Sequence, residues 1–210
     1  MDSHNFWIQE KALVDFLLPY VPARLETYHL TLLTLVWSFL AVLSWYLAYF
    51  TANPQWLWRL FAAIVLQYFS DLLDGAVWRA RDTGLVLWWF YMDHLLDYIF
   101  LISVFVAWWF VIPPELFVQF VLLVVVANVL FFHVFVSIPV TQVFSISFNK
   151  IWPTEYRMLA CLTIIWLIYF PTVLYYLSPI LLVILIASCI FMIYSTQKKL
   201  WDKDMENKNN

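Results

Sequence analysis

Long apolar runs dominate this chain and restrict it to folds that a lipid bilayer can surround. A helix needs about 20 mainly apolar residues to cross the hydrocarbon core of a bilayer. Six stretches approach or exceed that length: residues 30–50, 57–77, 85–112, 116–138, 158–176 and 180–194. Because backbone groups inside lipid must be paired within the protein, we expect an all-α membrane protein with six transmembrane helices.

The composition supports the membrane class and excludes others. Hydrophobic residues make up 65% of the chain and charged residues 12%, whereas about 25% of the residues in a soluble domain are charged. The net charge of −3 is too small to indicate nucleic acid as a partner. Cys161 and Cys189 both lie in apolar runs, so we expect no disulfide framework.

The chain divides into three segments by polarity. Residues 1–28 form a lead-in whose central part, residues 6–18, mixes apolar and charged side chains. That pattern is too polar to span a bilayer and predicts an N-terminal interfacial amphipathic helix, with an unstructured leader as the alternative. Residues 29–196 form the membrane domain, and residues 197–210 form a polar tail.

The basic residues indicate how six spans would be oriented. Ten of the eleven Lys and Arg residues would fall on one side of the bilayer, and Arg59 is the exception. Cytoplasmic loops of membrane proteins are enriched in Lys and Arg. We therefore expect an integral, multi-pass membrane protein with both termini in the cytoplasm.

Four aspartates interrupt the second and third apolar runs. Asp71 and Asp74 are three residues apart and Asp93 and Asp97 are four apart, so each pair shares a helix face. Each ionised carboxylate costs about 2.5–3.5 kcal/mol at the centre of a spanning helix on the insertion scale. The connection between the two runs is short, so the helices are expected to be antiparallel neighbours whose carboxylate pairs converge.

Such a cluster requires cations to neutralise it. Hard divalent ions with oxygen ligands, Mg²⁺ or Mn²⁺, are the expected occupants, and two of them can bridge a phosphate and stabilise both the attacking and the leaving oxygen. The alternative is a structural ion-pair network with Arg79 or Arg81.

The residues around these aspartates resemble the signature of the CDP-alcohol phosphatidyltransferases, D-x-x-D-G-x-x-A-R followed after eight or nine residues by G-x-x-x-D-x-x-x-D. This chain reads DLLDGAVWR from Asp71 to Arg79 and, nine residues later, WFYMDHLLD from Trp89 to Asp97. The pattern of spans and the segment PTEYR at residues 153–157 extend the resemblance over nearly the whole chain.

The resemblance implies a phospholipid-synthesising transferase. It would move a substituted phosphate from a CDP-linked lipid, with CDP-diacylglycerol the expected donor, to a small alcohol, and would release CMP on the cytoplasmic side. A homodimer is a further expectation, and the acceptor alcohol is not indicated. By position, the resemblance assigns two metal ions to Asp71, Asp74, Asp93 and Asp97, the nucleotide to Gly75, Trp78, Arg79 and Trp89, and an acceptor phosphate to Arg157.

Asp97 is also the candidate catalytic base. It lies farthest along the acidic face and is the aspartate least needed to hold both ions. A general base must reach the proton that it removes, which here belongs to the acceptor hydroxyl.

Two tryptophans depart from the signature. Trp78 stands where relatives have alanine or another small residue, and Trp89 stands where they have glycine; Trp152 likewise precedes Pro153 where glycine is expected. Either the chain is a diverged relative that has lost activity, or glycine codons have been read as tryptophan. The second explanation requires a genetic code in which UGA means glycine, and it fits a chain with 2 glycines and 13 tryptophans.

Two other functions fit part of the pattern. A non-catalytic descendant of the enzyme would keep the signature without turnover. A transporter for divalent cations would also carry buried acids, but transporters of that kind show internal repeats or broken helices, and the sequence indicates neither.

Overall fold

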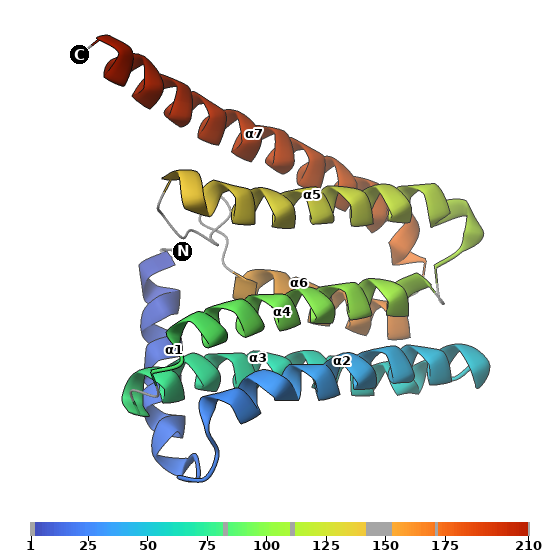
Figure 1. Cartoon of the computed structure of the whole chain (residues 1–210). Coiled ribbons are helices and arrows are strands. Elements are labelled where there is room, and N and C mark those ends of the chain that lie inside the picture. The colour runs from blue at the N-terminus through green and yellow to red at the C-terminus, as the bar shows by residue number, and fades with distance from the viewer. Residues whose placement is uncertain (1–2, 82–83, 110–111, 142–152, 171, 210) are drawn as a thin grey trace. The chain divides into compact units, whose positions relative to one another are not determined.

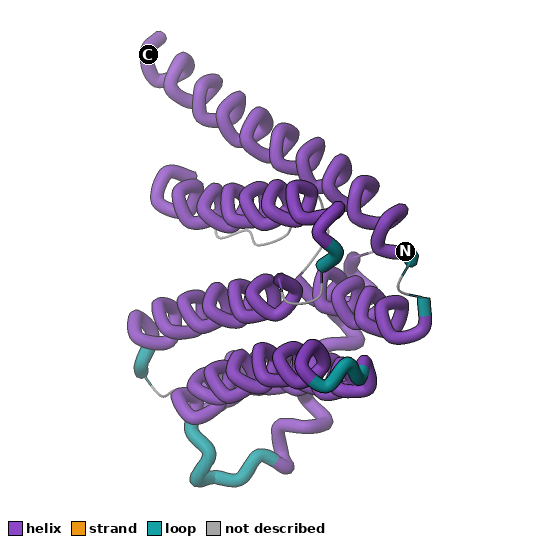
Figure 2. The backbone as a smooth tube through the Cα atoms, turned by 90° about the vertical axis from the view of Figure 1, so that its right-hand side faces the viewer, coloured by secondary structure: helices purple, strands orange, loops and turns teal. Residues whose placement is uncertain are grey.

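The computed structural model describes residues 3–81, 84–109, 112–141, 153–170 and 172–209, and these residues contain helices and no strand (Figures 1 and 2). The α-helices are α1 (Ser3–Leu17), α2 (Thr27–Phe50), α3 (Leu57–Arg81), α4 (Val86–Trp109), α5 (Phe117–Thr141), α6 (Pro153–Tyr169) and α7 (Val173–Asn209). Three short 3₁₀ turns join them: η1 (Leu18–Tyr20), η2 (Pro54–Trp56) and η3 (Pro114–Leu116).

Five stretches of the described residues are helical, long and apolar enough to cross a membrane. They are Thr27–Phe50, Pro54–Arg81, Val86–Trp109, Pro114–Ile138 and Val173–Glu206. These helices are compatible with an integral membrane protein, and they match five of the six expected spans.

The expected span at residues 158–176 differs. Helix α6 has 17 residues and ends at Tyr169, and its apolar part, Arg157–Tyr169, is shorter than a span. The sequence places Pro171 two residues beyond that end, and proline cannot continue the hydrogen-bond pattern of a helix.

The break expected between the spans at residues 158–176 and 180–194 is also absent, since Pro179 lies inside α7. Membrane helices tolerate proline where other groups satisfy the freed backbone. The last apolar run is therefore part of one long helix, which continues through the polar tail to Asn209.

The chain contains two compact units. The N-terminal unit comprises Met1–Val111 and Arg157–Ile168, and the C-terminal unit comprises Ile112–Tyr156 and Tyr169–Asn210. In the N-terminal unit α2, α3 and α4 run alongside one another and α1 crosses their ends (Figure 1). In the C-terminal unit α5 packs against α7.

Helix α2 is the centre of the N-terminal unit because it packs against both α3 and α4. Its buried face consists mostly of small residues, three or four apart, which allow close approach of helices. These residues are Thr27, Thr31, Thr34, Ser38, Ala41, Ser44 and Ala48. The Ser38 hydroxyl donates to the Thr34 carbonyl at 2.8 Å, and Ser44 donates to Leu40 at 2.6 Å, so these hydroxyls are satisfied inside their own helix.

Arg81, at the end of α3, fixes the segment that leads into α2. Its guanidinium donates to the carbonyl of Leu25 at 2.6 Å, of Pro22 at 3.1 Å, of Val21 at 3.3 Å and of Ala23 at 3.4 Å. A guanidinium carries five N–H donors in a rigid fork. One side chain therefore holds four carbonyls of a segment whose own backbone adds the bond from Leu25 N–H to Pro22 O at 2.9 Å.

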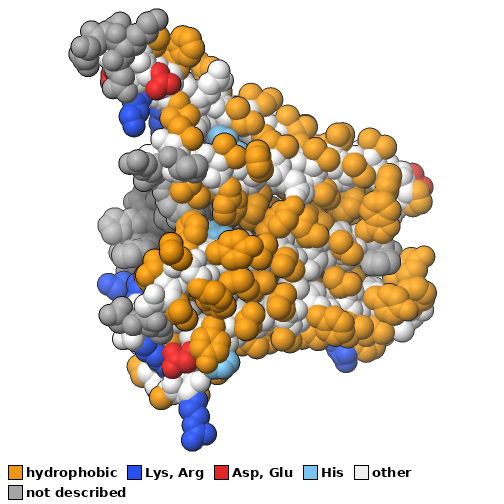
Figure 3. Space-filling view, viewed as in Figure 1, with side chains coloured by type: hydrophobic (Ala, Val, Ile, Leu, Met, Phe, Trp, Pro, Cys, Tyr) orange, Lys and Arg blue, Asp and Glu red, His pale blue; other side chains and the backbone are white. Residues whose placement is uncertain are grey.

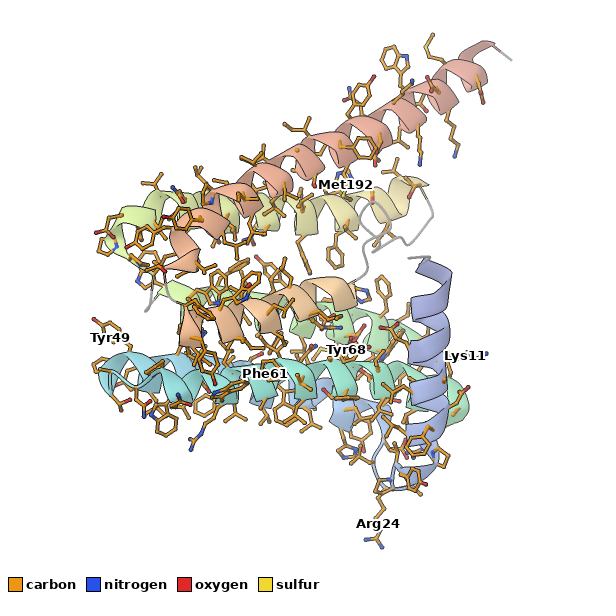
Figure 4. The ribbon with its side chains drawn as sticks, turned by 180° about the vertical axis from the view of Figure 1, so that it is seen from behind. Lys11, Arg24, Tyr49, Phe61, Tyr68 and Met192 are labelled. Atoms are coloured by element: carbon orange, nitrogen blue, oxygen red, sulfur yellow. The ribbon has the colours of Figure 1, made fainter. Side chains whose placement is uncertain are left out.

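Charge is distributed unevenly along the N-terminal unit. Hydrophobic side chains cover most of the visible flank of α2 and α4, while Lys and Arg side chains gather mainly at the end where α1 lies (Figure 3). Lys11 and Arg24 lie at that end, and Tyr49 lies at the opposite end of α2 (Figure 4).

Candidate functional site

Three of the four aspartates come together between α3 and α4. Asp71, Asp93 and Asp97 each offer a carboxylate oxygen, and the three oxygens lie within 4.8 Å of one another. Their side chains are 22%, 18% and 34% exposed respectively, so Asp97 is the most accessible of the three. The four-residue spacing of Asp93 and Asp97 places both on one face of α4, where they meet Asp71 of α3.

Arg157 supplies a cation to this group. Helix α6 brings its guanidinium Nη2 to 2.9 Å from Asp71 Oδ2 and 3.7 Å from Asp97 Oδ1. The guanidinium carbon also lies 5.7 Å from the centroid of the Tyr68 ring. The residue that the resemblance assigns to an acceptor phosphate thus lies directly beside the carboxylates.

Tyr68 connects this arginine to the N-terminal helix. Its hydroxyl donates to Glu10 Oε1 at 2.9 Å, and it lies on α3 nearer to α1 than Phe61 does (Figure 4). Helix α1 is therefore attached to the same part of α3 that carries the acids.

Gln67 is a site residue that the sequence reading missed. It is fully buried, and its Nε2 donates to Asp97 Oδ1 at 2.9 Å. Its Oε1 is buried and has no hydrogen-bond partner among the described residues. The signal was available, because Gln67 precedes Asp71 by four residues and so lies on the same helix face.

Asp74 is separate from the group of three. Its side chain is 1% exposed, and both oxygens accept hydrogen bonds from other helices. Thr31 Oγ1 on α2 donates to Oδ2 at 2.6 Å, and Trp89 Nε1 on α4 donates to Oδ1 at 2.9 Å. Asp74 therefore ties α3 to α2 and α4.

The residues assigned to the nucleotide lie together beside Asp74. Trp78 and Trp89 stack with ring centroids 4.9 Å apart and planes 7° apart. A Cβ at Gly75 would lie 3.7 Å from Trp89 Cζ2 and 3.3 Å from Arg79 Nη1. Gly75 thus allows both the indole and the guanidinium to lie close to α3. Trp152 lies outside the described residues.

His94 lies next to the acid group but faces its own helix. Its Nδ1 is 2.6 Å from the Phe90 carbonyl oxygen and 3.7 Å from Asp93 Oδ2. The shorter contact shows that the imidazole donates to the backbone one turn earlier, so Asp93 keeps oxygen lone pairs for another partner.

The donors fit a hard divalent ion. Three carboxylates and one neighbouring buried amide oxygen without a partner are the ligand types that Mg²⁺ and Mn²⁺ take in proteins. If the three carboxylates are ionised, Arg157 balances one of their charges, and two negative charges remain in a largely apolar surrounding. One divalent ion would balance that remainder.

Comparison with protein-family models, with curated proteins and with solved structures gives no match to this chain.

Proposed function

We propose that the chain is a CDP-alcohol phosphatidyltransferase, which moves a substituted phosphate from CDP-diacylglycerol or a similar CDP-linked lipid to a small alcohol and releases CMP. The observation that carries the proposal is the gathering of Asp71, Asp93 and Asp97 within 4.8 Å, on two apolar helices, at positions of the aspartate signature. Acids at such positions in apolar helices are costly and usually serve a function.

In this proposal Asp71, Asp93 and Asp97 hold Mg²⁺ or Mn²⁺. The ion would neutralise charge on the transferred phosphate and on the departing CMP. The resemblance adds Asp74 and a second ion to this set, although both Asp74 oxygens accept hydrogen bonds from Thr31 and Trp89.

Asp97 is the proposed general base for the acceptor hydroxyl. It is the most exposed of the three acids, so an acceptor can reach it. The Gln67 amide donates to its Oδ1 at 2.9 Å, which leaves Oδ2 to receive the proton.

Arg157 and the residues around Gly75 complete the proposed site. A guanidinium can bind a phosphate through two parallel hydrogen bonds, and Arg157 lies within 4 Å of two of the acids, where an acceptor phosphate would be close to the base. Arg79 is exposed and lies beside Gly75, a position suited to the pyrophosphate of the CDP-lipid.

In this proposal the chain is an integral membrane protein, and its site opens to the cytoplasm. Lys11 and Arg24 lie at the α1 end of the N-terminal unit (Figure 4), and basic residues favour the cytoplasmic side. Helix α1 would then rest in the membrane interface.

Turnover by the purified chain tests the proposal. The protein in lipid nanodiscs would receive CDP-diacylglycerol, Mg²⁺ and, in separate reactions, glycerol phosphate, inositol phosphate, serine, choline or ethanolamine, and CMP release would be measured. We expect release with one acceptor, its loss in excess chelator, and its loss in Asp93→Asn but not in Asp15→Asn. Release that continues in chelator would contradict the metal assignment.

A non-catalytic relative is the second candidate, and a specific observation favours it. The stacked indoles of Trp78 and Trp89 fill space where the signature has small residues. Such a protein would bind CDP-diacylglycerol and Mg²⁺, as measured by calorimetry, and would release no CMP with any acceptor.

A further inference from the structure

Asp74 serves as a hydrogen-bond acceptor that joins three helices. It is 1% exposed, lies on α3, and receives Thr31 from α2 and Trp89 from α4 at 2.6 and 2.9 Å. Each carboxylate oxygen has its own donor. Both donors are neutral, and each occupies one acceptor site on its oxygen without supplying a cation.

The Trp89 indole, which carries this donor, has a close neighbour at one face and another at its edge. One face of its indole stacks on Trp78 with planes 7° apart, and its edge lies 3.7 Å from the place where a Cβ at Gly75 would be. The indole has a single N–H donor. A ring stacked on Trp78 cannot turn this N–H elsewhere without losing that contact.

The charge of the three grouped aspartates also indicates that one divalent ion is bound. Asp71, Asp93 and Asp97 lie within 4.8 Å of one another, and Arg157 already approaches two of them. One divalent ion balances the remaining charge of this group. A second ion would need ligands beyond the group, and turning Asp74 toward the group would take this acceptor away from the N–H of the half-buried Trp89 indole.

We propose that the chain as written binds a single divalent ion, on Asp71, Asp93 and Asp97, and that Trp89 excludes a second ion by holding Asp74. This inference rests on the metal site of the proposed function and specifies its stoichiometry. Trp89 is a positioning residue in this scheme, because it acts on the metal site through Asp74.

The inference can be tested by measuring Mn²⁺ binding directly, which does not require the protein to have enzymatic activity. The full chain in nanodiscs would be titrated with Mn²⁺, and free Mn²⁺ would be counted by its electron paramagnetic resonance signal. We expect one bound ion per unchanged chain. Trp89→Gly removes the indole and frees Asp74, so we expect two ions.

Two further variants keep the test independent of folding defects in Trp89→Gly. Trp89→Phe keeps an aromatic ring against Trp78 and loses only the N–H donor, so it should also gain a second ion, at least tenfold weaker than the first. Trp88→Phe changes the exposed neighbouring tryptophan and should remain at one ion.

The outcomes separate the inference from the proposed function. Two ions on the unchanged chain, or one ion on both Trp89 variants, would overturn the inference and leave the proposed metal site intact. No bound Mn²⁺ on the unchanged chain would overturn the metal site itself, and the inference with it.

Discussion

The two units of the chain bury different kinds of side chain. In the N-terminal unit α2 presents a stripe of threonine, serine and alanine to its neighbours, and Gln67, Ser70 and Asp74 are buried on α3. In the C-terminal unit the buried side chains among the described residues are Leu116, Phe120 and Cys189, and the large hydrophobic residues of α5 and α7 are mostly exposed.

The described residues of the C-terminal unit make few side-chain hydrogen bonds between helices. Ser178 donates to Gln119 at 2.8 Å, Tyr175 donates to Glu115 at 3.3 Å, and Thr196 Oγ1 lies 3.3 Å from His133 Nε2. Interhelical hydrogen bonds in membranes contribute only about 0.6 kcal/mol on average. The comparison indicates that the N-terminal unit uses buried polar groups to position charge, whereas the C-terminal unit uses apolar surface suited to lipid.

Among the changes proposed, Asp97→Asn should reduce CMP release the most. An amide cannot accept the acceptor's proton, and a general base contributes about 10²–10⁴-fold to a rate. We expect CMP release to fall about 10³-fold while CDP-diacylglycerol binding changes by less than about threefold, because asparagine keeps a side-chain oxygen for the ion and loses only the basic oxygen. Glu115→Gln, a carboxylate of the C-terminal unit, is the matched control and should retain full turnover. Equal losses of binding and turnover in Asp97→Asn would mean that Asp97 is a binding residue only.

Arg157→Gln should change two properties in opposite directions. Removing the guanidinium leaves Asp71 and Asp97 without their internal cation, so Mn²⁺ should bind about tenfold more tightly, equivalent to about 1.4 kcal/mol. The KM for an acceptor phosphate should rise. Arg24→Gln, an exposed arginine of the same unit, should do neither. Weaker Mn²⁺ binding in Arg157→Gln would show that the arginine supports the metal site instead of competing with the ion.

Replacing both Trp78 and Trp89 by glycine should raise turnover several-fold. The stack fills the space where the signature has small residues, so its removal should open room for CDP-diacylglycerol. The same change removes packing, and loss of a buried aromatic costs about 3–5 kcal/mol, so the melting temperature should fall. Unchanged turnover would mean that the site has been rebuilt around the indoles. UGA codons at positions 78 and 89 would instead identify the glycine form as the natural one.

Among the changes proposed, Ser178→Ala should have the smallest effect on stability and turnover. It removes one hydrogen bond to Gln119 in the C-terminal unit, which should cost about 0.6 kcal/mol and leave CMP release unchanged. Thr31→Val, which removes the donor to the buried Asp74, should cost more, about 1–3 kcal/mol. Thermal unfolding in one detergent compares the two. A larger loss in Ser178→Ala would reverse the proposed contrast between the units.

The apolar runs predicted the helices well because lipid leaves few alternatives for a backbone. Proline was harder to interpret: Pro171 falls inside the fifth expected span but two residues beyond the end of α6, whereas Pro179 falls between the last two expected spans but inside α7.

The site was predictable where it depends on one helix and not where it depends on several. Helical spacing grouped Asp71 with Asp74 and Asp93 with Asp97, and it would also have found Gln67. The partners of Asp74 could not be found in this way, because Thr31 and Trp89 lie on other helices, 43 and 15 residues away. The Thr31 hydroxyl is also 3.0 Å from the Thr27 carbonyl oxygen of its own helix.

The hydrogen bonds from Arg81 to the segment before α2 can form only late in the synthesis of the chain. The carbonyls that Arg81 holds lie 56 to 60 residues earlier in the chain. A nascent chain is made from its N-terminus at about 5–20 residues per second, so Arg81 is added several seconds after the residues whose carbonyls it binds. During that interval residues 21–25 lack their contacts with Arg81, and ribosome-bound chains that stop before residue 81 should have these residues open to a protease that cannot cut the finished protein there.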